Sequence, residues 1–271
     1  MTELTHFRFA KYEGLGNDFV VVDSANDALL DRAQVARVCD RHFGVGADGV
    51  LLVTPPASLG ARATMVVLNA DGSRPEMCGN GLRCVALHLA LQDRSAGVSF
   101  IVDTDAGPRL VAVERGADGA SVTVSMGRGV PRGELAFSRG NVVRNFALIS
   151  MGNPHAVSFE GLIDEQALDV LGPAVSSQFP TGSNVELVVQ RGPRELEVLV
   201  WERGVGRTLA CGTGACAVAV AAARQGLVPF DAEIQVALPG GPLHISVARE
   251  TLDVTMRGPA RRVFSGEVPV R

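Results

Sequence analysis

Two segments of this chain of 271 residues are versions of one motif, and they restrict its fold more than any other feature. They read CGNGLRCVA from Cys78 and CGTGACAVA from Cys211. Cys-Gly-x-Gly followed by an apolar run without proline is typical of a tight turn that leads into a buried helix. We therefore expect each cysteine at a helix N-terminus. The unpaired N–H groups and the positive end of the helix dipole favour an anion there, which predicts that both thiols ionise below their usual pKa of about 8.5.

The two motifs lie about half of the chain apart. Further pairs recur at nearly the same interval, namely Gly16-Asn17 with Gly152-Asn153, Gly107-Pro108 with Gly241-Pro242, and Asn69 with Glu202. Such a repeat predicts two tandem versions of one domain. A Gly/Pro/Arg stretch at 127–133 breaks the strand pattern and marks the boundary. We expect an N-terminal half at 1–128 and a C-terminal half at 129–261, with the tail 262–271 packing back on the first half.

Alternating and β-branched runs predict that both halves are mostly strand. The expected strands are 7–12, 19–22, 50–53, 64–68, 98–102, 110–113 and 122–126 in the first half, and 142–150, 156–159, 185–189, 196–201, 234–237, 243–247 and 252–256 in the second. Short helices are expected at 31–41 and 164–171, capped by Asp31 and Asp164.

The helices that begin at the cysteines are apolar on nearly all sides, so they must be buried on all sides. The first is expected to end near Gln92 and to bury Leu82, Val85, Ala86, Leu87, Leu89, Ala90 and Leu91; the second buries 215–223. The fold class is therefore α/β (α+β): two pseudo-symmetric tandem domains, each a mostly antiparallel strand barrel wrapped around a central helix. Such a duplication can hold both thiols across an interdomain cleft, on opposite sides of a small ligand.

The composition excludes several other classes of protein. A net charge of −4 without a basic stripe gives no reason to expect nucleic acid. No apolar run reaches the roughly 18 residues of a membrane span, and no leader precedes the first strand, so we expect a cytoplasmic protein without membrane contact. Five cysteines in such a chain argue against a disulfide framework, and we interpret Cys39, Cys84 and Cys216 as buried core thiols.

Two opposed thiols suit a two-base reaction. One removes a proton from a carbon and the other supplies a proton to the opposite face, which inverts that carbon. If no cofactor acts as an electron sink, preorganised donors must stabilise the developing charge. The backbone N–H groups of Gly79, Asn80, Gly212 and Thr213 are at the expected helix N-termini and are suited to this.

Competing interpretations use the same residues. A cysteine at a glycine turn is more often structural, but both copies keep it while neighbouring residues differ. A thiol-redox protein would carry Cys-x-x-Cys, which is absent, although Cys78 and Cys211 could form a bridge if they face each other. A zinc protein would need grouped Cys/His ligands, and the five histidines do not have that spacing. The loop 44–49 resembles a phosphate loop, but a strand follows it, which argues against nucleotide binding.

Seven segments together carry a specific resemblance. They are GLGNDF with Asn17, NADGS from Asn69, CGNGLRC from Cys78, MGNPH with Asn153, GSN ending at Asn184, Glu202-Arg203-Gly, and ACGTGAC with Cys211. In this order the chain resembles the diaminopimelate epimerases. The resemblance implies cofactor-independent, metal-independent interconversion of LL- and meso-2,6-diaminopimelate, on the route to lysine and peptidoglycan, by a homodimeric isomerase.

The resemblance also assigns roles to residues. It implies that Cys78 and Cys211 are the acid and base, and that Gly79-Asn80 and Gly212-Thr213 cradle the reacting carboxylate. It implies that the substrate is held by Asn17, Asn69, Asn153, Asn184, Glu202 and Arg203. Two positions depart from the family: Gly49 stands where many members have glutamine, and Thr213 stands where others have serine.

Three assignments have alternatives. Glu202-Arg203 alone would be an ordinary surface pair, but it precedes Cys211 as Asn69 precedes Cys78. His155 is either a turn histidine hydrogen-bonded to backbone or a residue that contacts the substrate-binding side chains without touching the substrate. A proline-racemase-like or phenazine-biosynthesis-like isomerase would share the fold, but its single-headed substrate would not require the Glu202-Arg203 and asparagine set.

Overall fold

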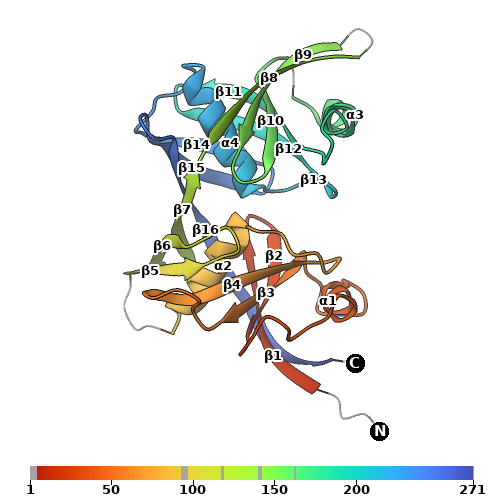
Figure 1. The fold of residues 1–271 in the computed structure, drawn as a ribbon, viewed down its shortest axis with the longest axis vertical. Helices are drawn as coiled ribbons and strands as arrows, with labels where there is room; N and C mark the ends of the chain where they lie inside the picture. Colours follow the sequence, from red (N-terminus) through yellow and green to blue (C-terminus); the bar gives the residue numbers. More distant parts are fainter. Residues whose placement is uncertain (1–4, 93–96, 117–118, 140–141, 162, 271) are drawn as a thin grey trace. The chain divides into compact units, whose positions relative to one another are not determined.

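The computed structural model describes residues 5–92, 97–116, 119–139, 142–161 and 163–270 (Figure 1). Contacts divide the chain into two compact units. Unit 1 runs to Val124 and takes up the chain again at Gly258, and unit 2 is Ser125–Arg257.

Unit 1 is a sheet with two helices. Its elements in chain order are β1 (Thr5–Gly14), β2 (Asn17–Asp23), α1 (Arg32–Cys39), β3 (Gly49–Thr54), β4 (Ala61–Asn69), α2 (Gly79–Ala90), β5 (Gly97–Asp103), β6 (Arg109–Arg115) and β7 (Ala120–Arg128). Neighbouring strands follow the chain from β1 to β7, and β16 lies next to both β7 and β1, which closes the order. The pairs β2–β3 and β4–β5 are parallel, and α2 contacts β1, β2 and β6.

Unit 2 has the same plan. Its elements are β8 (Val130–Arg139), β9 (Val142–Ser150), β10 (Pro154–Ser158), α3 (Glu165–Ser176), β11 (Asn184–Gly192), β12 (Glu195–Glu202), β13 (Gly206–Thr208), α4 (Gly212–Arg224), β14 (Glu233–Leu238), β15 (Gly241–Val247) and β16 (Asp253–Val270). The strand order is β16-β15-β14-β12-β11-β10-β9-β8, and β13 pairs with β12. Here β10–β11 and β12–β14 are the parallel pairs.

The strand registers show that the two units repeat residue by residue. Phe19 pairs with Gly49 between β2 and β3, and His155 pairs with Asn184 between β10 and β11. Likewise Val50 faces Leu68, and Val185 faces Trp201. The predicted mixed α+β fold of two tandem, strand-rich domains is confirmed.

The cysteine-capped helices are buried as predicted. Every residue of α4 except Arg224 is buried, and in α2 only His88 is not fully buried. Leu91 was expected to be buried and is 41% exposed, because it lies after the last turn of α2 as the C-cap. Arg83 lies inside this apolar helix with no exposed surface, and its Nε donates to the Pro259 carbonyl at 3.0 Å. Burial on all sides therefore fixes both helix axes.

The remaining helices, α1 and α3, pack on the other face of the strands in their units. Asp31 caps α1 with a full capping box with Gln34, and Asp164 caps α3 by accepting from the Ala167 N–H, so both predicted caps are confirmed. Val35 and Val38 of α1 pack against β3 in one core, while Leu168 and Leu171 of α3 pack against β11 in the other. The β3 and β11 strands are thus covered on both faces.

The expected break at 127–133 is wrong. β7 continues to Arg128 and β8 begins at Val130, so this glycine-rich stretch is almost entirely strand. The Gly129 N–H donates to the Leu252 carbonyl at 2.9 Å, and a register shift between Pro131 and Gly133 accommodates the proline. The sequence also missed β8, β13 and the second part of β16.

Two strands, β7 and β16, each begin in one unit and continue into the other. β7 passes from unit 1 into unit 2 after Val124 and leads directly into β8, which pairs with β9. β16 begins beside β15 in unit 2, and its later residues pair with β1 in unit 1, from Arg261 opposite Glu13 to Val270 opposite Thr5. Arg271, the last residue of the predicted tail, lies outside the described residues. Each sheet is thus completed by residues that follow the other unit in the chain.

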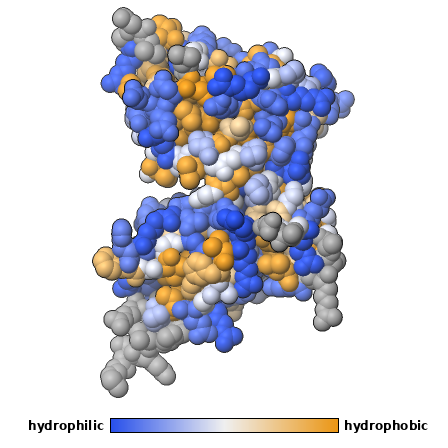
Figure 2. Space-filling model, turned by 180° about the vertical axis from the view of Figure 1, so that it is seen from behind, coloured by the Kyte–Doolittle hydropathy of each residue, from blue (hydrophilic) through white to orange (hydrophobic). Residues whose placement is uncertain are grey.

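Hydrophilic side chains cover much of the face that Figure 2 shows, with apolar patches between them. In the part of the chain that the structure describes, no helix is long and apolar enough to cross a membrane.

Ending the chain after Ala260 tests the strand exchange. The truncation removes the residues of β16 that pair with residues 5–9, whereas β2 remains beside residues 10–14. We therefore expect the amides of the first part of β1 to lose most of their protection from hydrogen exchange, while α4 amides stay protected. Hydrogen exchange measured by mass spectrometry on the full and shortened chains checks this. Unchanged protection of β1 would contradict the role of these residues.

Candidate active site

Cys78 and Cys211 are the N-caps of α2 and α4, as the motifs predict. The Cys78 Sγ accepts from the Gly81 N–H at 3.3 Å, and the Cys211 Sγ accepts from the Gly214 N–H at the same distance. Both cysteines have extended backbone dihedrals, so the chain turns into the helix directly after the thiol. Gly79 and Gly212 are the first residues of the two helices.

The two cysteines differ in burial. Cys78 is half-buried, whereas Cys211 is 5% exposed. Burial raises the pKa of Cys211 well above its ordinary value, and the Glu202 carboxyl raises it further. Hydrogen bonds from the Thr213 hydroxyl and the Gly214 N–H lower the pKa of Cys211, but by less than burial raises it. The predicted ionisation below the usual pKa is therefore wrong for Cys211, because desolvation outweighs the helix terminus.

The three remaining cysteines are buried, as expected. Burial raises the pKa of Cys39 to about 11 and raises that of Cys84 further. Cys216 lies inside α4 with no exposed surface.

Asn17 and Asn80 meet beside the N-terminus of α2. The Asn80 amide nitrogen donates to Asn17 Oδ1 at 3.1 Å, and Asn80 Oδ1 accepts from Arg83 Nη1 at 3.0 Å. Asn17 Nδ2 in turn donates to Asp48 Oδ2 at 2.7 Å. Both carbonyl and amide ends of these asparagines are thereby oriented by neighbours.

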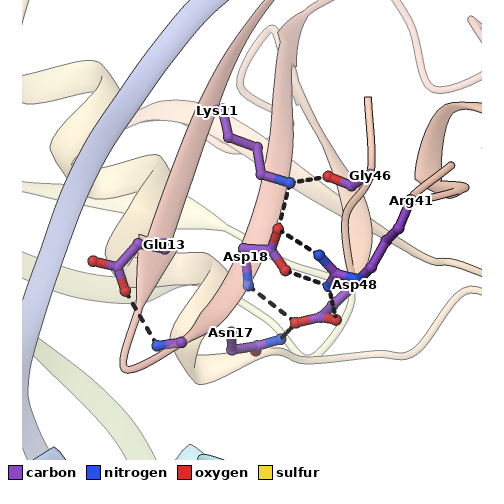
Figure 3. A network of polar contacts seen from close by, with 8 residues as sticks. Lys11, Glu13, Asn17, Asp18, Arg41, Gly46 and Asp48 are labelled. Carbon is purple, nitrogen blue, oxygen red and sulfur yellow. Dashed lines mark hydrogen bonds and ion pairs between the residues drawn. The ribbon is translucent and has the colours of Figure 1, made fainter. Parts of the chain in front are cut away.

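An ionic network holds Asp48 and the strand that carries Asn17 (Figure 3). Arg41 bridges Asp18 and Asp48, with 2.7 Å from its Nη2 to one oxygen of each. On the other side Asp18 pairs with the buried Lys11, whose ammonium also donates to the Gly46 carbonyl. Burial alone would raise the pKa of Asp18, but the hydrogen bonds from Arg41 and Lys11 outweigh it and the pKa is lowered.

Asn69 ends β4, opposite Gly49, and its side chain is exposed. Its Nδ2 donates to Ser73 Oγ at 2.9 Å within the turn that leads toward Cys78. Gly72 of this turn has a φ of +74°, which favours glycine.

In unit 2 a line of hydrogen bonds reaches Cys211. Glu186 Oε1 lies 2.6 Å from His155 Nδ1, and His155 Nε2 lies 3.0 Å from Asn153 Oδ1. Asn153 Nδ2 donates to Thr213 Oγ1 at 3.3 Å, and that hydroxyl lies 3.5 Å from Cys211 Sγ. The Asn153–Thr213 contact repeats the Asn17–Asn80 contact of unit 1 at equivalent positions.

Of the other predicted residues of unit 2, Glu202 reaches the same cysteine, and Asn184 bonds the backbone next to Glu202 in the chain. Asn184 Nδ2 donates to the Pro154 carbonyl at 3.0 Å, and its Oδ1 accepts from the Arg203 N–H at 2.9 Å. Glu202 accepts from Thr208 Oγ1 at 2.6 Å and is hydrogen-bonded to the Cys211 thiol. Burial raises the pKa of Glu202, and these contacts oppose it. The Arg203 guanidinium is exposed and donates to the Thr181 carbonyl at 3.1 Å.

Sequence reasoning missed several residues that orient these groups: Lys11, Asp18, Arg41, Asp48, Arg83, Glu186 and Thr208. Two of them gave a readable signal. Arg83 is the one arginine in the apolar run of α2, and Glu186 is a lone carboxylate in the apolar strand NVELVV. A charged side chain inside such a run must be paired or functional.

The comparison with known families decides where the chain belongs. A family model described as diaminopimelate epimerase matches residues 9–130 and 147–263. The chain belongs to the diaminopimelate epimerase family. A diaminopimelate epimerase of Heliobacterium modesticaldum is 41% identical over 285 residues, covering 97% of this chain and 99% of the relative. One of Desulforudis audaxviator is 44% identical over 278 residues, with 96% and 98% covered.

Solved structures show how widely the fold is shared. A hydroxyproline epimerase of Agrobacterium vitis, with bound trans-4-hydroxy-L-proline, matches with a TM-score of 0.78 at 14% identity, covering 98% of this chain and 93% of that one. This likeness concerns the fold alone.

Among the described residues of this family member, no group of three or more His, Cys, Asp or Glu side chains is placed to hold a metal ion.

Asp18→Asn tests the ionic network. The substitution leaves the buried Lys11 without its carboxylate, so we expect a loss of about 3 kcal/mol in the free energy of unfolding at neutral pH. Because the folded-state pKa of Asp18 is lowered, its stabilisation is present above the unfolded value of about 3.9 and is lost as the pH falls through the folded value. The difference between wild type and variant should therefore shrink in acid.

Urea unfolding of both proteins between neutral and acidic pH measures this difference. Glu267→Gln is the matched control, because it removes an exposed pair with Arg8 that should contribute at most about 1 kcal/mol. An Asp18→Asn loss no larger than that of the control would refute the role of the network.

Proposed function

We propose that this chain interconverts LL- and meso-2,6-diaminopimelate without a cofactor, with Cys78 and Cys211 as acid and base. It is then an isomerase of the amino-acid epimerase class, acting in the biosynthesis of lysine and peptidoglycan. One observation carries the proposal: two thiols cap the first turns of two equivalent buried helices in a chain whose relatives are named diaminopimelate epimerase.

The two helix termini supply what proton abstraction from an α-carbon needs. One cysteine takes the α-proton as a thiolate while the other delivers a proton to the opposite face, so the configuration inverts. Negative charge develops on the reacting carboxylate, and the N–H groups of Gly79-Asn80 and Gly212-Thr213 stabilise it. The raised pKa of Cys211 supports its entry as the neutral acid in one direction. In the reverse direction the roles exchange, so Cys211 must then be stabilised as a thiolate.

The remaining predicted residues suit a substrate with two amino-acid heads. Arg203 is exposed and can pair with a carboxylate through its planar fork, and Glu202 can accept from an ammonium group. The asparagines 17, 69, 153 and 184 offer both donors and acceptors. A single-headed substrate such as proline leaves this set without a function, which favours diaminopimelate over the substrates of structural relatives.

Three finer features belong to the same proposal. We place the protein in the cytoplasm as a homodimer, without nucleic-acid or membrane partners, in agreement with the net charge and the family. The domains are the halves 1–128 and 129–261, with the tail 262–271 belonging to the first. The pairing of Arg262 and the residues after it with β1 supports this organisation.

Deuterium exchange tests the reaction. We expect reduced protein incubated with LL-diaminopimelate in D2O, without pyridoxal phosphate, to yield meso product labelled at the inverted carbon. NMR and chiral chromatography measure label and product, and L-proline serves as the control substrate. Folded protein that exchanges no deuterium into diaminopimelate would refute the proposal.

Cys78→Ala and Cys211→Ala test the two roles separately. Each should lower kcat for epimerisation by at least about 100-fold, because one proton transfer loses its catalyst. Cys39→Ala is the matched control, since it removes a buried thiol from the core beneath α1 and should leave the kinetics unchanged. Wild-type activity in either of the first two variants would remove that cysteine from its role.

A further inference from the structure

The repeat allows the two cysteine sites to be compared within one chain. Leu51 of β3 and Glu186 of β11 occupy equivalent positions. The residue before Leu51, Val50, pairs with Leu68, and the residue before Glu186, Val185, pairs with Trp201 at the matching place in the second unit. Both side chains press against the first helical turn. A Cβ on Gly81 would lie 3.0 Å from Leu51 Cδ2, and a Cβ on Gly214 would lie 2.9 Å from Glu186 Oε1.

The strands next to β3 and β11 show the same difference, with an apolar side chain in unit 1 and a polar one in unit 2. Phe19 of β2 and His155 of β10 are equivalent, because they pair with Gly49 and Asn184 in the two registers. All four side chains are buried. Unit 1 thus has a phenylalanine and a leucine at the buried positions where unit 2 has a histidine and a glutamate. Because burying an ion pair costs desolvation that apolar side chains avoid, the fold does not require the polar pair.

The contacts of the pair determine where its protons are. Asn153 Nδ2 donates to Thr213, so Asn153 Oδ1 faces His155 Nε2, which must therefore carry a hydrogen. Glu186 Oε2 is buried and has no hydrogen-bond partner among the described residues. An ionised carboxylate pays heavily for a buried, unsatisfied oxygen, so the shared proton belongs on Glu186 Oε1, which donates it to His155 Nδ1. Burial likewise raises the pKa of Glu186.

We propose that Glu186 is a positioning residue that locks His155 with its hydrogen on Nε2 and thereby aims the Thr213 hydroxyl at Cys211 Sγ. The direction follows step by step. His155 Nε2–H donates to Asn153, Asn153 donates to Thr213, and the Thr213 hydrogen is left to point at the sulfur 3.5 Å away. The Cys211 thiolate gains a donor that compensates for its burial.

The surroundings of Cys211 show why such a donor is useful. The Glu202 carboxyl at the end of β12 contacts the thiol, which also accepts from the Gly214 N–H of α4. The carboxyl disfavours the thiolate, so a neutral rather than ionised Glu186 avoids a second opposing charge. In unit 1 the equivalent asparagine, Asn17, is oriented instead by Asp48, within the ionic network at the surface.

The double variant His155→Phe/Glu186→Leu copies the unit 1 arrangement into unit 2. We expect its melting temperature to equal or exceed that of wild type, because the apolar pair is already compatible with this fold. We expect kcat for epimerisation to fall by at least about tenfold. A residue pair needed only for folding would give the opposite result, with lost stability. This kinetic part rests on the proposed epimerase function.

Two single variants distinguish a role of Glu186 in positioning His155 from a role of its charge. Glu186→Gln can donate its amide N–H to His155 Nδ1, so it should keep kcat within about threefold of wild type. Glu186→Leu cannot, and the limb of the pH–rate profile that reports Cys211 should move to higher pH as the thiolate loses its donor. Equal kcat and equal pH profiles in wild type and Glu186→Leu would overturn the proposal.

An NMR measurement does not depend on activity. With ¹⁵N-labelled histidine, five imidazoles are to be resolved, and the His155→Phe spectrum assigns the signal of interest. We expect wild type and Glu186→Gln at neutral pH to carry the His155 hydrogen on Nε2, and Glu186→Leu to show mixed tautomers. A hydrogen absent from Nε2 in wild type would overturn the proposal, even if the enzyme epimerises diaminopimelate. The expected tautomer in a protein without that activity would contradict only the proposed function.

Discussion

The structure around both candidate sites depends on the complete burial of α2 and α4. A helix packed on all sides cannot rotate or slide without disrupting its core, so the first-turn N–H groups and the capping sulfur are fixed together. Gly81 and Gly214 suit this arrangement, because a Cβ at either position would crowd the side chain of Leu51 or Glu186. The thiols are therefore held by backbone and core packing, and the surrounding polar side chains only modify their properties.

Much of this arrangement could be predicted from local sequence. The cysteine caps, the aspartate caps and most strands follow from spacing, and the motif resemblance is confirmed by the family match. β8 was missed because it contains Pro131 and Gly133, and its outward side chains are largely exposed, so no alternating pattern marks it. The raised pKa of Cys211 was missed for another reason. It depends on the burial of the thiol and on the nearby Glu202 carboxyl, and both arise only once α4 has packed and β12 has folded.

The repeat separates what the fold needs from what one site adds. Both units keep the glycine turn, the capped helix and an amide contact beside it, in Asn17–Asn80 and Asn153–Thr213. They differ in what orients that amide, since unit 1 uses a partly exposed carboxylate and unit 2 a buried imidazole. Two sites with one backbone plan thus surround their thiols with different side chains.

The exchanged strands also determine the order in which the protein can fold. β1 precedes all of unit 2 in the chain, but the part of β16 that pairs with it follows all of unit 2, and Arg8 meets Glu267 at a separation of 259 positions. Contacts so distant in sequence slow folding and leave strand edges open in the meantime. The sheet of unit 1 can therefore be completed only after all of unit 2 has been made, whereas unit 2 is contiguous in the chain. The chain order makes the second copy of the repeat the earlier one to mature.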